Sequence, residues 1–276
     1  MRHSKVLAKI RQDIPAFGVS LHLNSPDLFE LVGLMGFDSI WIDLEHHAAS
    51  MESAANLMRG ARVGGADVVA RPGKGEFMRM GRMLEIGASG IMYPRCETAE
   101  EAAEVVRWAK FAPLGERGCD ASGADVPFLL TPLTQYLEEA NRETFLIIQI
   151  EDPKSLDHVE AIASVPGVDM LMLGPGDFSI LSGIPGQFDH PLVQEAQHRV
   201  IEAAKSAGIH WAATCGSAAQ AKKFADQGAR LLFYGCDLVL VKQGLDRIQA
   251  ELAEFSSIAT PKVTDRTNSK YYQESL

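Results

Sequence analysis

The sequence has few basic residues relative to acidic ones, and this deficit excludes several classes of partner. Lys and Arg together number 26, against 36 Asp and Glu, so the formal net charge is −10 and the isoelectric point is near 5.3. Such a chain offers no basic face to a phosphate backbone or to anionic lipid. We therefore expect neither nucleic acid nor a membrane surface among its partners.

Long apolar runs and closely spaced cysteines are also missing. No run approaches the roughly 18 residues that span a bilayer, and the first five residues are not followed by the hydrophobic block of a signal peptide. The chain has four cysteines and no C-x-x-C pair, which argues against a disulfide framework and a zinc ribbon. We expect a cytoplasmic protein with four reduced thiols.

What the sequence does have is a repeated signal for a helix followed by a strand. A glycine ends a helical stretch, and a short apolar run begins a few residues later. Glycine supplies the left-handed conformation that ends a helix, and a short continuous apolar run is typical of a strand buried on both faces. The signal occurs six times, at Gly36, Gly65, Gly87, Gly167, Gly208 and Gly228.

Two further strand-like runs, at 17–21 and 145–150, bring the count to eight. Eight strands that alternate with helices over about 250 residues favour a single (β/α)₈ TIM barrel over an open doubly wound sheet. We assign residues 1–258 to this domain and residues 259–276 to a polar tail without periodicity. A Gly-, Asp- and Pro-rich insertion at 111–132 interrupts the alternation, and a loop of this length is usually an active-site cover or an interface segment.

In a barrel, the side chains at the carboxyl ends of the strands surround the active site, so polar residues that end an apolar run are the candidates. Helix N-cap signals that follow several runs, such as Ser25-Pro26 and Asp152-Pro153, fix where the strands end. The candidates are Asp43, Glu45, His46, His47, Arg71, Gln149, Glu151 and the segment Gly174-Pro175-Gly176-Asp177.

Glu151 and Asp177 follow neighbouring strands, and Gln149 shares a face with Glu151 because side chains alternate along a strand. Two carboxylates at one point suit a hard divalent ion such as Mg²⁺ or Mn²⁺. A pair of helix N-caps or surface carboxylates explains the same residues equally well.

Arg71 is followed by Pro72-Gly73, so we expect its guanidinium at the rim, where it would bind a carboxylate or stabilise an enolate. A surface ion pair is the alternative. His46 and His47 diverge on extended backbone, so at most one faces the site as a proton carrier. The alternative is a histidine satisfied by nearby backbone. Lys74 and Lys154 lie beyond the strand ends, which leaves no well-placed Schiff-base amine.

Four short motifs in register extend these hypotheses. Asp43-x-Glu45-His46, Val69-Ala70-Arg71-Pro72, Gln149-x-Glu151 and Gly174-Pro175-Gly176-Asp177-Phe178-Ser179 resemble the class II hydroxy ketoacid aldolases. The agreement in order and spacing covers nearly the whole chain, from about residue 17 to residue 252.

This resemblance implies that Glu151 and Asp177 bind Mg²⁺, Mn²⁺ or Co²⁺, which pyruvate chelates through its 2-oxo and carboxylate oxygens. Arg71 would hold the oxo oxygen, with Gln149 nearby, and the backbone of Gly174, Pro175, Gly176 and Asp177 would receive the carboxylate. The implied reaction cleaves or forms a 4-hydroxy-2-oxo acid from pyruvate and an aldehyde through a metal-bound enolate.

The resemblance also assigns His46 as the catalytic histidine and Asp43 as the residue that holds metal-bound water. Glu85 stands where the family often has an aspartate that orients the histidine. The family forms homo-oligomers, often hexamers in which the last helix is exchanged between partners. Arg95 and Cys96 stand where small or aliphatic residues are usual, and Arg95 would either select an anionic aldehyde or point outward.

Three other functions stay open. The same enolate chemistry serves a lyase or decarboxylase acting on another 2-oxo acid, such as oxaloacetate. A barrel that binds a ligand without turnover is a second alternative. A phosphate-binding barrel is a third, since Cys215-Gly216-Ser217 follows a strand, although such a turn is more often a helix N-cap.

Overall fold

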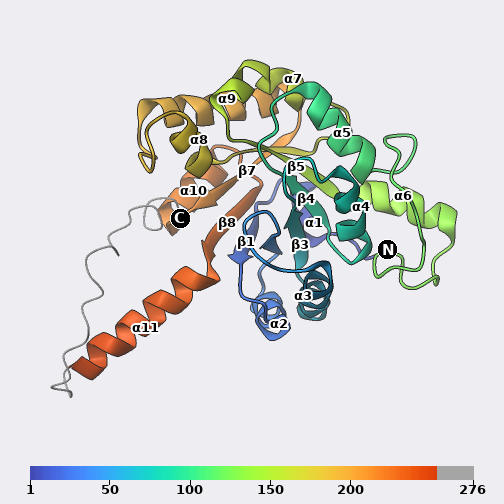
Figure 1. Ribbon diagram of the computed structural model, residues 1–276, viewed down its shortest axis with the longest axis horizontal. Helices are drawn as coiled ribbons and strands as arrows, with labels where there is room; N and C mark the ends of the chain where they lie inside the picture. The colour runs from blue at the N-terminus through green and yellow to red at the C-terminus, as the bar shows by residue number, and fades with distance from the viewer. Residues whose placement is uncertain (254–276) are drawn as a thin grey trace.

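In the computed structural model, which describes residues 1–253, eight parallel strands close into a barrel in the order β1 to β8 (Figure 1). The predicted TIM barrel is therefore confirmed. The strands are β1 Ala16–Leu21, β2 Ser39–Asp43, β3 Asp67–Arg71, β4 Gly90–Tyr93, β5 Phe145–Ile150, β6 Met170–Leu173, β7 His210–Cys215 and β8 Leu231–Cys236.

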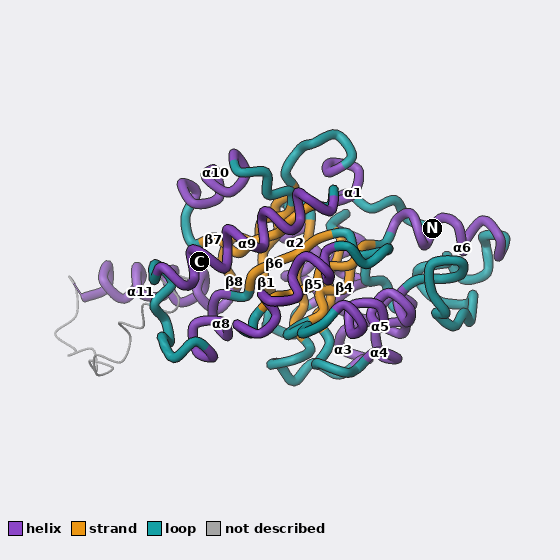
Figure 2. The backbone as a smooth tube through the Cα atoms, turned by 90° about the horizontal axis from the view of Figure 1, so that it is seen from above, coloured by secondary structure: helices purple, strands orange, loops and turns teal. Residues whose placement is uncertain are grey.

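Helices surround the strands, as the view from above shows (Figure 2). They are α1 Lys5–Ile10, α2 Pro26–Leu34, α3 Met51–Gly64, α4 Phe77–Glu85, α5 Ala99–Ala109, α6 Leu133–Glu143, the 3₁₀-helix η1 Pro153–His158, α7 Val159–Ala163, α8 Pro175–Leu181, α9 Pro191–Ala207, α10 Ala218–Asp226 and α11 Asp237–Ala253.

The local signals in the sequence act as expected. All six glycines that mark the helix-to-strand connections have positive φ angles, between 70° and 123°. Ser25 accepts a hydrogen bond from the amide of Leu28 and caps α2, and Pro26 occupies the first turn. Ser217 caps α10 by accepting from the amide of Gln220, so the turn after β7 is a helix N-cap. These connections place every strand end at the same side of the barrel.

The barrel interior is filled with large apolar side chains and is closed at its amino end by α1. Val6, Leu7 and Ile10 of α1 pack with interior residues such as Met92 and Phe233. The sequence analysis did not predict this helix, which is only six residues long. With the amino end plugged, a ligand can reach the interior from the carboxyl ends of the strands.

The 111–132 insertion lies at the amino end, because it follows α5, which runs antiparallel to the strands. The amide of Ala124 donates to the carbonyl of Glu85 at 3.0 Å, and Arg117 forms a buried ion pair with Asp125 at 2.8 Å. The insertion therefore does not cover the active site of its own barrel, and that prediction is wrong. The alternative, an interface segment, stays a prediction.

Helix α11 leaves the end of β8 and extends away from the barrel (Figure 1). Because α11 does not cover the barrel, Phe17 on β1 is 41% exposed and Tyr234 on β8 is 40% exposed. The predicted boundary at 258/259 and the polar tail lie outside the described residues. None of the helices within residues 1–253 has the length and apolar character needed to cross a bilayer.

Candidate active site

A cavity of about 190 Å³ opens at the carboxyl ends of the strands. It brings together most of the residues selected from the sequence, although they come from five different strands or the turns after them. Its lining consists of Trp41, His46, Arg71, Gln149, Glu151, Met172, Gly174, Pro175, Gly176, Asp177 and Thr214.

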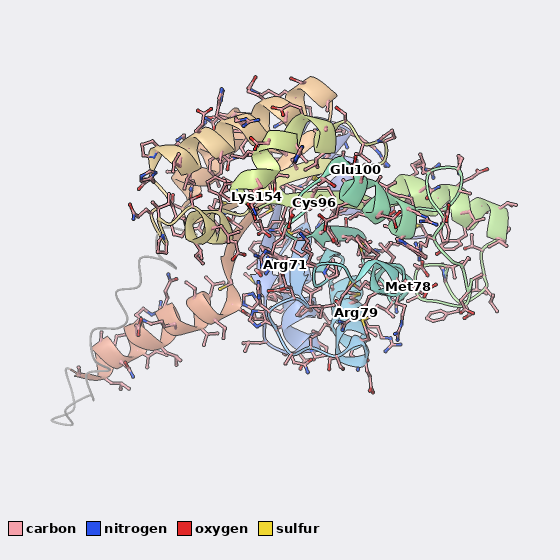
Figure 3. The ribbon with its side chains drawn as sticks, turned by 45° about the horizontal axis from the view of Figure 1, so that its top comes forward. Arg71, Met78, Arg79, Cys96, Glu100 and Lys154 are labelled. Atoms are coloured by element: carbon pink, nitrogen blue, oxygen red, sulfur yellow. The ribbon has the colours of Figure 1, made fainter. Side chains whose placement is uncertain are left out.

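Arg71 is the cationic centre of this cavity. It is 7% exposed, and it donates to both carboxylate oxygens of Asp43, from Nε at 3.0 Å and from Nη2 at 2.7 Å. Its guanidinium also lies 4.8 Å from the ring of Trp41, and Nη1 donates to Gln149 Oε1 at 3.4 Å. In Figure 3 Arg71 lies over the strands, apart from Arg79 on α4. The prediction that Arg71 lies at the rim is wrong, because the last side chain of β3 points into the barrel. Its burial also excludes the alternative of a surface ion pair.

Asp43 fixes the orientation of this guanidinium. Burial alone would raise the pKa of Asp43, but the hydrogen bonds and charge of Arg71, together with the amides of Glu45 and His46, hold it below its ordinary value. A bidentate pair constrains both the position and the plane of the guanidinium. Asp43 therefore acts in this arrangement as a positioning residue for Arg71.

Glu45 belongs to the site as well, and the sequence analysis assigned it no role. Its Oε2 lies 3.3 Å from Arg71 Nε and 3.5 Å from His46 Nε2, and this oxygen is buried without a hydrogen-bond partner among the described residues. Burial raises the pKa of Glu45, and the neighbouring charges of Asp43 and Asp177 add to the effect. The sequence spacing could have identified Glu45 as a site residue, since it is two residues beyond Asp43 and its side chain emerges on the same side.

Glu151 is almost fully buried at the end of β5. Its Oε2 accepts a hydrogen bond from the amide of Arg95 at 3.0 Å, and a Cβ on Gly174 would overlap its other oxygen. Burial raises the pKa of Glu151 to about 7, with Asp177 and Glu45 adding to the effect and Arg71 opposing it. Glycine at position 174 is thus required for this carboxylate to reach the cavity.

These carboxylates fit a divalent cation. Glu151 and Asp177 line one cavity, and the charge of Asp177 adds to the raised pKa of Glu151, so a cation between the two carboxylates would offset that repulsion. Oxygen donors suit Mg²⁺, Mn²⁺ or Co²⁺, and a site with two protein carboxylates leaves positions for substrate oxygens and water. The donor set is therefore consistent with the metal that the sequence predicts.

Arg95 contributes to the site through its backbone. Its φ angle of 52° lies in the left-handed region, which turns its amide toward Glu151. The carbonyl of Arg95 accepts from Lys74 Nζ at 2.9 Å, and Lys74 also pairs with Glu97. Lys154 is exposed. Neither lysine is positioned as a Schiff-base amine, in agreement with the sequence analysis.

The two adjacent histidines diverge as expected. His46 lines the cavity with a side chain that is 54% exposed. His47 instead stacks on His22, with ring centroids 4.1 Å apart and an interplanar angle of 19°. Its Nε2 is 3.8 Å from Asp43 Oδ2. Of the two rings, His46 is the one placed to exchange a proton with a ligand in the cavity.

Glu85 is not brought to this site within the chain. It is the last residue of α4, and α4 runs back from the end of β3 toward the amino end of the barrel. The charges around Glu85 belong to Arg117, Asp125 and Asp120 of the insertion. The predicted orienting contact between Glu85 and His46 of one chain is therefore wrong, because the helix direction places them at opposite ends.

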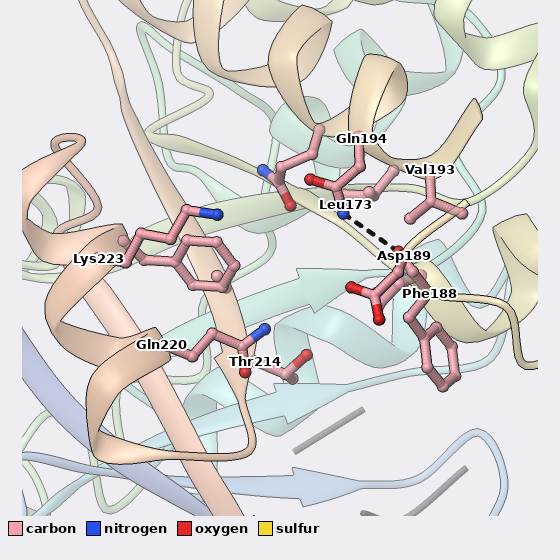
Figure 4. Close-up of a pocket in the computed structure, with 12 residues that line it drawn as sticks. Leu173, Phe188, Asp189, Val193, Gln194, Thr214, Gln220 and Lys223 are labelled. Atoms are coloured by element: carbon pink, nitrogen blue, oxygen red, sulfur yellow. Dashed lines mark hydrogen bonds between the residues drawn. The ribbon is translucent and has the colours of Figure 1, made fainter. Parts of the chain in front are cut away.

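A second cavity of about 170 Å³ adjoins the first, and both are lined by Pro175 and Thr214. Figure 4 shows Lys223 and Gln220 of α10 on one side of it and Asp189 on the other. Among residues 1–253, its lining includes a single carboxylate and no arginine. It therefore lacks the paired acids of the first cavity and is not a second copy of that site.

Comparison with known proteins identifies relatives of this chain. Residues 17–243 match the family model described as HpcH/HpaI aldolase/citrate lyase. A hydroxypyruvate/pyruvate aldolase of Delftia acidovorans is 29% identical over 94% of both chains, and a 2-keto-3-deoxy-L-rhamnonate aldolase of Klebsiella pneumoniae is 32% identical over 87% of this chain and 88% of its own. The crystal structure of an HpcH/HpaI aldolase from Desulfitobacterium hafniense superimposes with a TM-score of 0.84 at 29% identity, covering 92% of this chain and 98% of that one.

Proposed function

Because the chain belongs to the HpcH/HpaI aldolase/citrate lyase family, whose members make or break carbon–carbon bonds, we propose that it is a divalent-metal-dependent pyruvate aldolase. It would cleave or form a 4-hydroxy-2-oxo acid from pyruvate and an aldehyde. The observation that carries the proposal is the convergence of Arg71, Glu151 and Asp177 on one cavity.

The residues divide the work of binding. Glu151 and Asp177 would hold Mg²⁺, Mn²⁺ or Co²⁺, and such a cation polarises a 2-oxo group as a Lewis acid. The amides of Gly176 and Asp177 lie in the first turn of α8, where helix geometry leaves them without an intrahelical acceptor. They are suited to receive the substrate carboxylate. Gln149 lies beside Arg71 and completes the polar wall.

Arg71 would stabilise the charge that develops during cleavage. When the C3–C4 bond breaks, its electron pair enters the pyruvate enolate, and the negative charge reaches the former oxo oxygen. Arg71 is already held by Asp43, so little reorganisation accompanies the reaction. A donor fixed in advance in a site that excludes water is the arrangement that lowers such barriers most.

His46 would carry the proton. In the cleavage direction it accepts the C4 hydroxyl proton, directly or through a water molecule, as that oxygen becomes the aldehyde carbonyl. It then returns a proton to C3 of the enolate, which releases pyruvate. An imidazole titrating near neutral pH suits both steps.

We expect His46→Gln to lower kcat by about 100-fold, at the lower end of the range for losing a general base. His47→Gln is the matched control, because that ring stacks on His22 and does not line the cavity. Its effect should be much smaller. Steady-state kinetics of both variants on one substrate make the comparison, and equal losses would remove His46 from its role.

A pyruvate-release screen tests the proposed activity. Metal-free protein is assayed with 4-hydroxy-2-oxo acids of different length and terminal charge, each with Mg²⁺, Mn²⁺ and Co²⁺. We expect turnover that requires added metal and stops with EDTA. Activity confined to substrates with a terminal carboxylate would support a role for Arg95 in acceptor selection. Release of pyruvate from oxaloacetate alone would replace the aldolase with the decarboxylase alternative, which passes through the same enolate.

We also propose that the chain forms a homo-oligomer, with a hexamer as the expected form, in which α11 packs on a partner barrel. The support is that α11 extends from its own barrel with Leu238, Val241, Leu245 and Ile248 all more than 45% exposed, at 49%, 47%, 55% and 46%. An apolar helix in this position needs a covering surface.

A charge on this helix tests the assembly. Leu245→Glu should dissociate the oligomer, as measured by light scattering after size-exclusion chromatography, because burial of the new carboxylate against an apolar surface is unfavourable. Arg247→Glu on the same helix is the control for added negative charge, since Arg247 is 78% exposed at its side chain. A monomeric wild type would contradict this proposal and leave the aldolase proposal standing.

A further inference from the structure

A second group of potential metal ligands lies at the seam between β1 and β8. His22 follows β1, Cys236 ends β8, and Asp237 begins α11. Each of these three residues offers one ligand atom, and the three atoms all lie within 4.8 Å of one another. Among the His, Cys, Asp and Glu side chains of residues 1–253, this is the group of three that meets that distance. It shares no residue with the cavity that holds Glu151 and Asp177.

The backbone at this seam is distorted in a way that builds the group. The pairing register between β1 and β8 shifts between Gly18 and Ser20, which brings Cys236 opposite Ser20. Gly235 has a φ of 76°, a conformation that a glycine adopts without strain. Irregularities of this kind redirect the side chains next to them. Here the shift places the Cys236 thiol beside the residue that follows β1.

His22 is oriented with one ring nitrogen directed at the group. Its Nε2 lies 3.1 Å from Ser20 Oγ, and its Nδ1 is buried without a hydrogen-bond partner among the described residues. If Nε2 donates its proton to Ser20, Nδ1 presents a lone pair. A metal-binding histidine characteristically donates its other N–H to a neighbouring oxygen in this way.

That lone pair faces an acceptor. His22 Nδ1 is 3.4 Å from Asp237 Oδ1, and the other oxygen of Asp237 already accepts from the amides of His22 and Leu23, at 2.8 and 2.7 Å. Two acceptors that face each other repel, so either a proton on His22 Nδ1 or a metal ion between the two atoms stabilises this arrangement. The separation matches that of two ligands on one tetrahedral ion, about 3.3–3.8 Å for bonds of 2.0–2.3 Å.

We propose that His22, Cys236 and Asp237 form a binding site for a borderline transition metal, Zn²⁺ or Co²⁺. One imidazole nitrogen, one thiolate and one carboxylate supply three ligands, and a water molecule or solvent completes the tetrahedron. This donor set differs from the all-oxygen carboxylates of the catalytic cavity, because a thiolate and an imidazole favour Zn²⁺ or Co²⁺ over Mg²⁺. A bound ion here ties the end of β1 to the start of α11.

Cobalt provides a direct test, because a thiolate ligand gives Co²⁺ a sulfur-to-metal charge-transfer band in the near ultraviolet and carboxylates do not. The full-length protein carries Glu151→Gln, which disables the proposed catalytic metal site, and Cys119→Ser, which removes the exposed thiol. After treatment with EDTA it is titrated with Co²⁺ under reducing, oxygen-free conditions. We expect the band to grow to saturation at one cobalt ion per chain.

Three further variants assign the ligands. Cys236→Ser should lose the band, whereas Cys215→Ser should keep it, since Cys215 is a buried thiol at the end of the neighbouring strand β7. His22→Gln should weaken the binding and serves as the comparison if Cys236→Ser does not fold. Zn²⁺ should raise Tm in the parent protein and not in these two ligand variants. Absence of the band, or its persistence without Cys236, overturns this site and leaves the aldolase proposal untouched.

Discussion

Glu151→Gln is expected to abolish divalent-metal binding at the catalytic cavity, and aldolase activity with it. Replacement of one ionised oxygen ligand by an amide should weaken Mn²⁺ binding by more than about 100-fold, since even changes to groups that only orient a ligand cost about 10- to 100-fold. Calorimetric titration of the metal-free protein with Mn²⁺ measures the loss directly. Asp177→Asn should give the same result, because both carboxylates line the cavity.

Stability distinguishes a lost metal ligand from a damaged fold. The folded-state pKa of Glu151 is about 7, above its ordinary value of 4.5, so the unfolded chain releases this proton at lower pH than the folded one. Ionised Glu151 therefore costs stability as pH rises through that window. Without metal, Glu151→Gln should be at least as stable as the wild type above pH 7. A lower Tm there, or unchanged Mn²⁺ affinity, would contradict the assignment.

Arg71→Lys is expected to lower kcat/KM by about 100-fold, which corresponds to the roughly 3 kcal/mol lost when one oxyanion donor is removed. Lysine keeps the charge, but it lacks the planar fork that binds both oxygens of Asp43. Arg71→Ala should lose at least as much activity. It would also leave Asp43 buried without its partner, so Lys is the better replacement for the kinetic measurement.

Metal affinity separates the role of Arg71 from that of Glu151. Removal of the Arg71 guanidinium should leave Mn²⁺ binding unchanged or slightly tighter, because Arg71 and the metal compete for the negative charge of Glu151. Calorimetry on Arg71→Ala shows whether this separation holds. Wild-type kcat/KM in this variant would remove Arg71 from the mechanism.

Much of the fold follows from local signals in the sequence. The glycines that end helices, the N-cap residues and the short apolar runs each act within a few residues of the chain. Eight strands that alternate with helices leave few topologies other than a barrel. The six-residue α1 was not predicted, because its role depends on packing against the distant interior of the barrel.

The site was predicted to the extent that it depends on strand direction. Parallel strands end on one side, so Gln149, Glu151 and Asp177 could be grouped before any coordinates were known. The location of residues at the ends of helices was harder to predict. Glu85 ends a helix that returns to the amino end, and the insertion that follows α5 lies at that end for the same reason. The burial of Arg71 depends on its pairing with Asp43, a contact between side chains that spacing alone does not specify.

The most direct test is a crystal structure with Mn²⁺ and pyruvate, recorded at the manganese absorption edge. The account predicts an anomalous difference peak at about 2.0–2.3 Å from one carboxylate oxygen of Glu151 and one of Asp177, the distances typical of small divalent cations bound by oxygen ligands. The pyruvate oxo oxygen should bind the same ion and accept a hydrogen bond from Arg71. A peak elsewhere with none between these two carboxylates, or pyruvate bound out of reach of Arg71, would contradict the account.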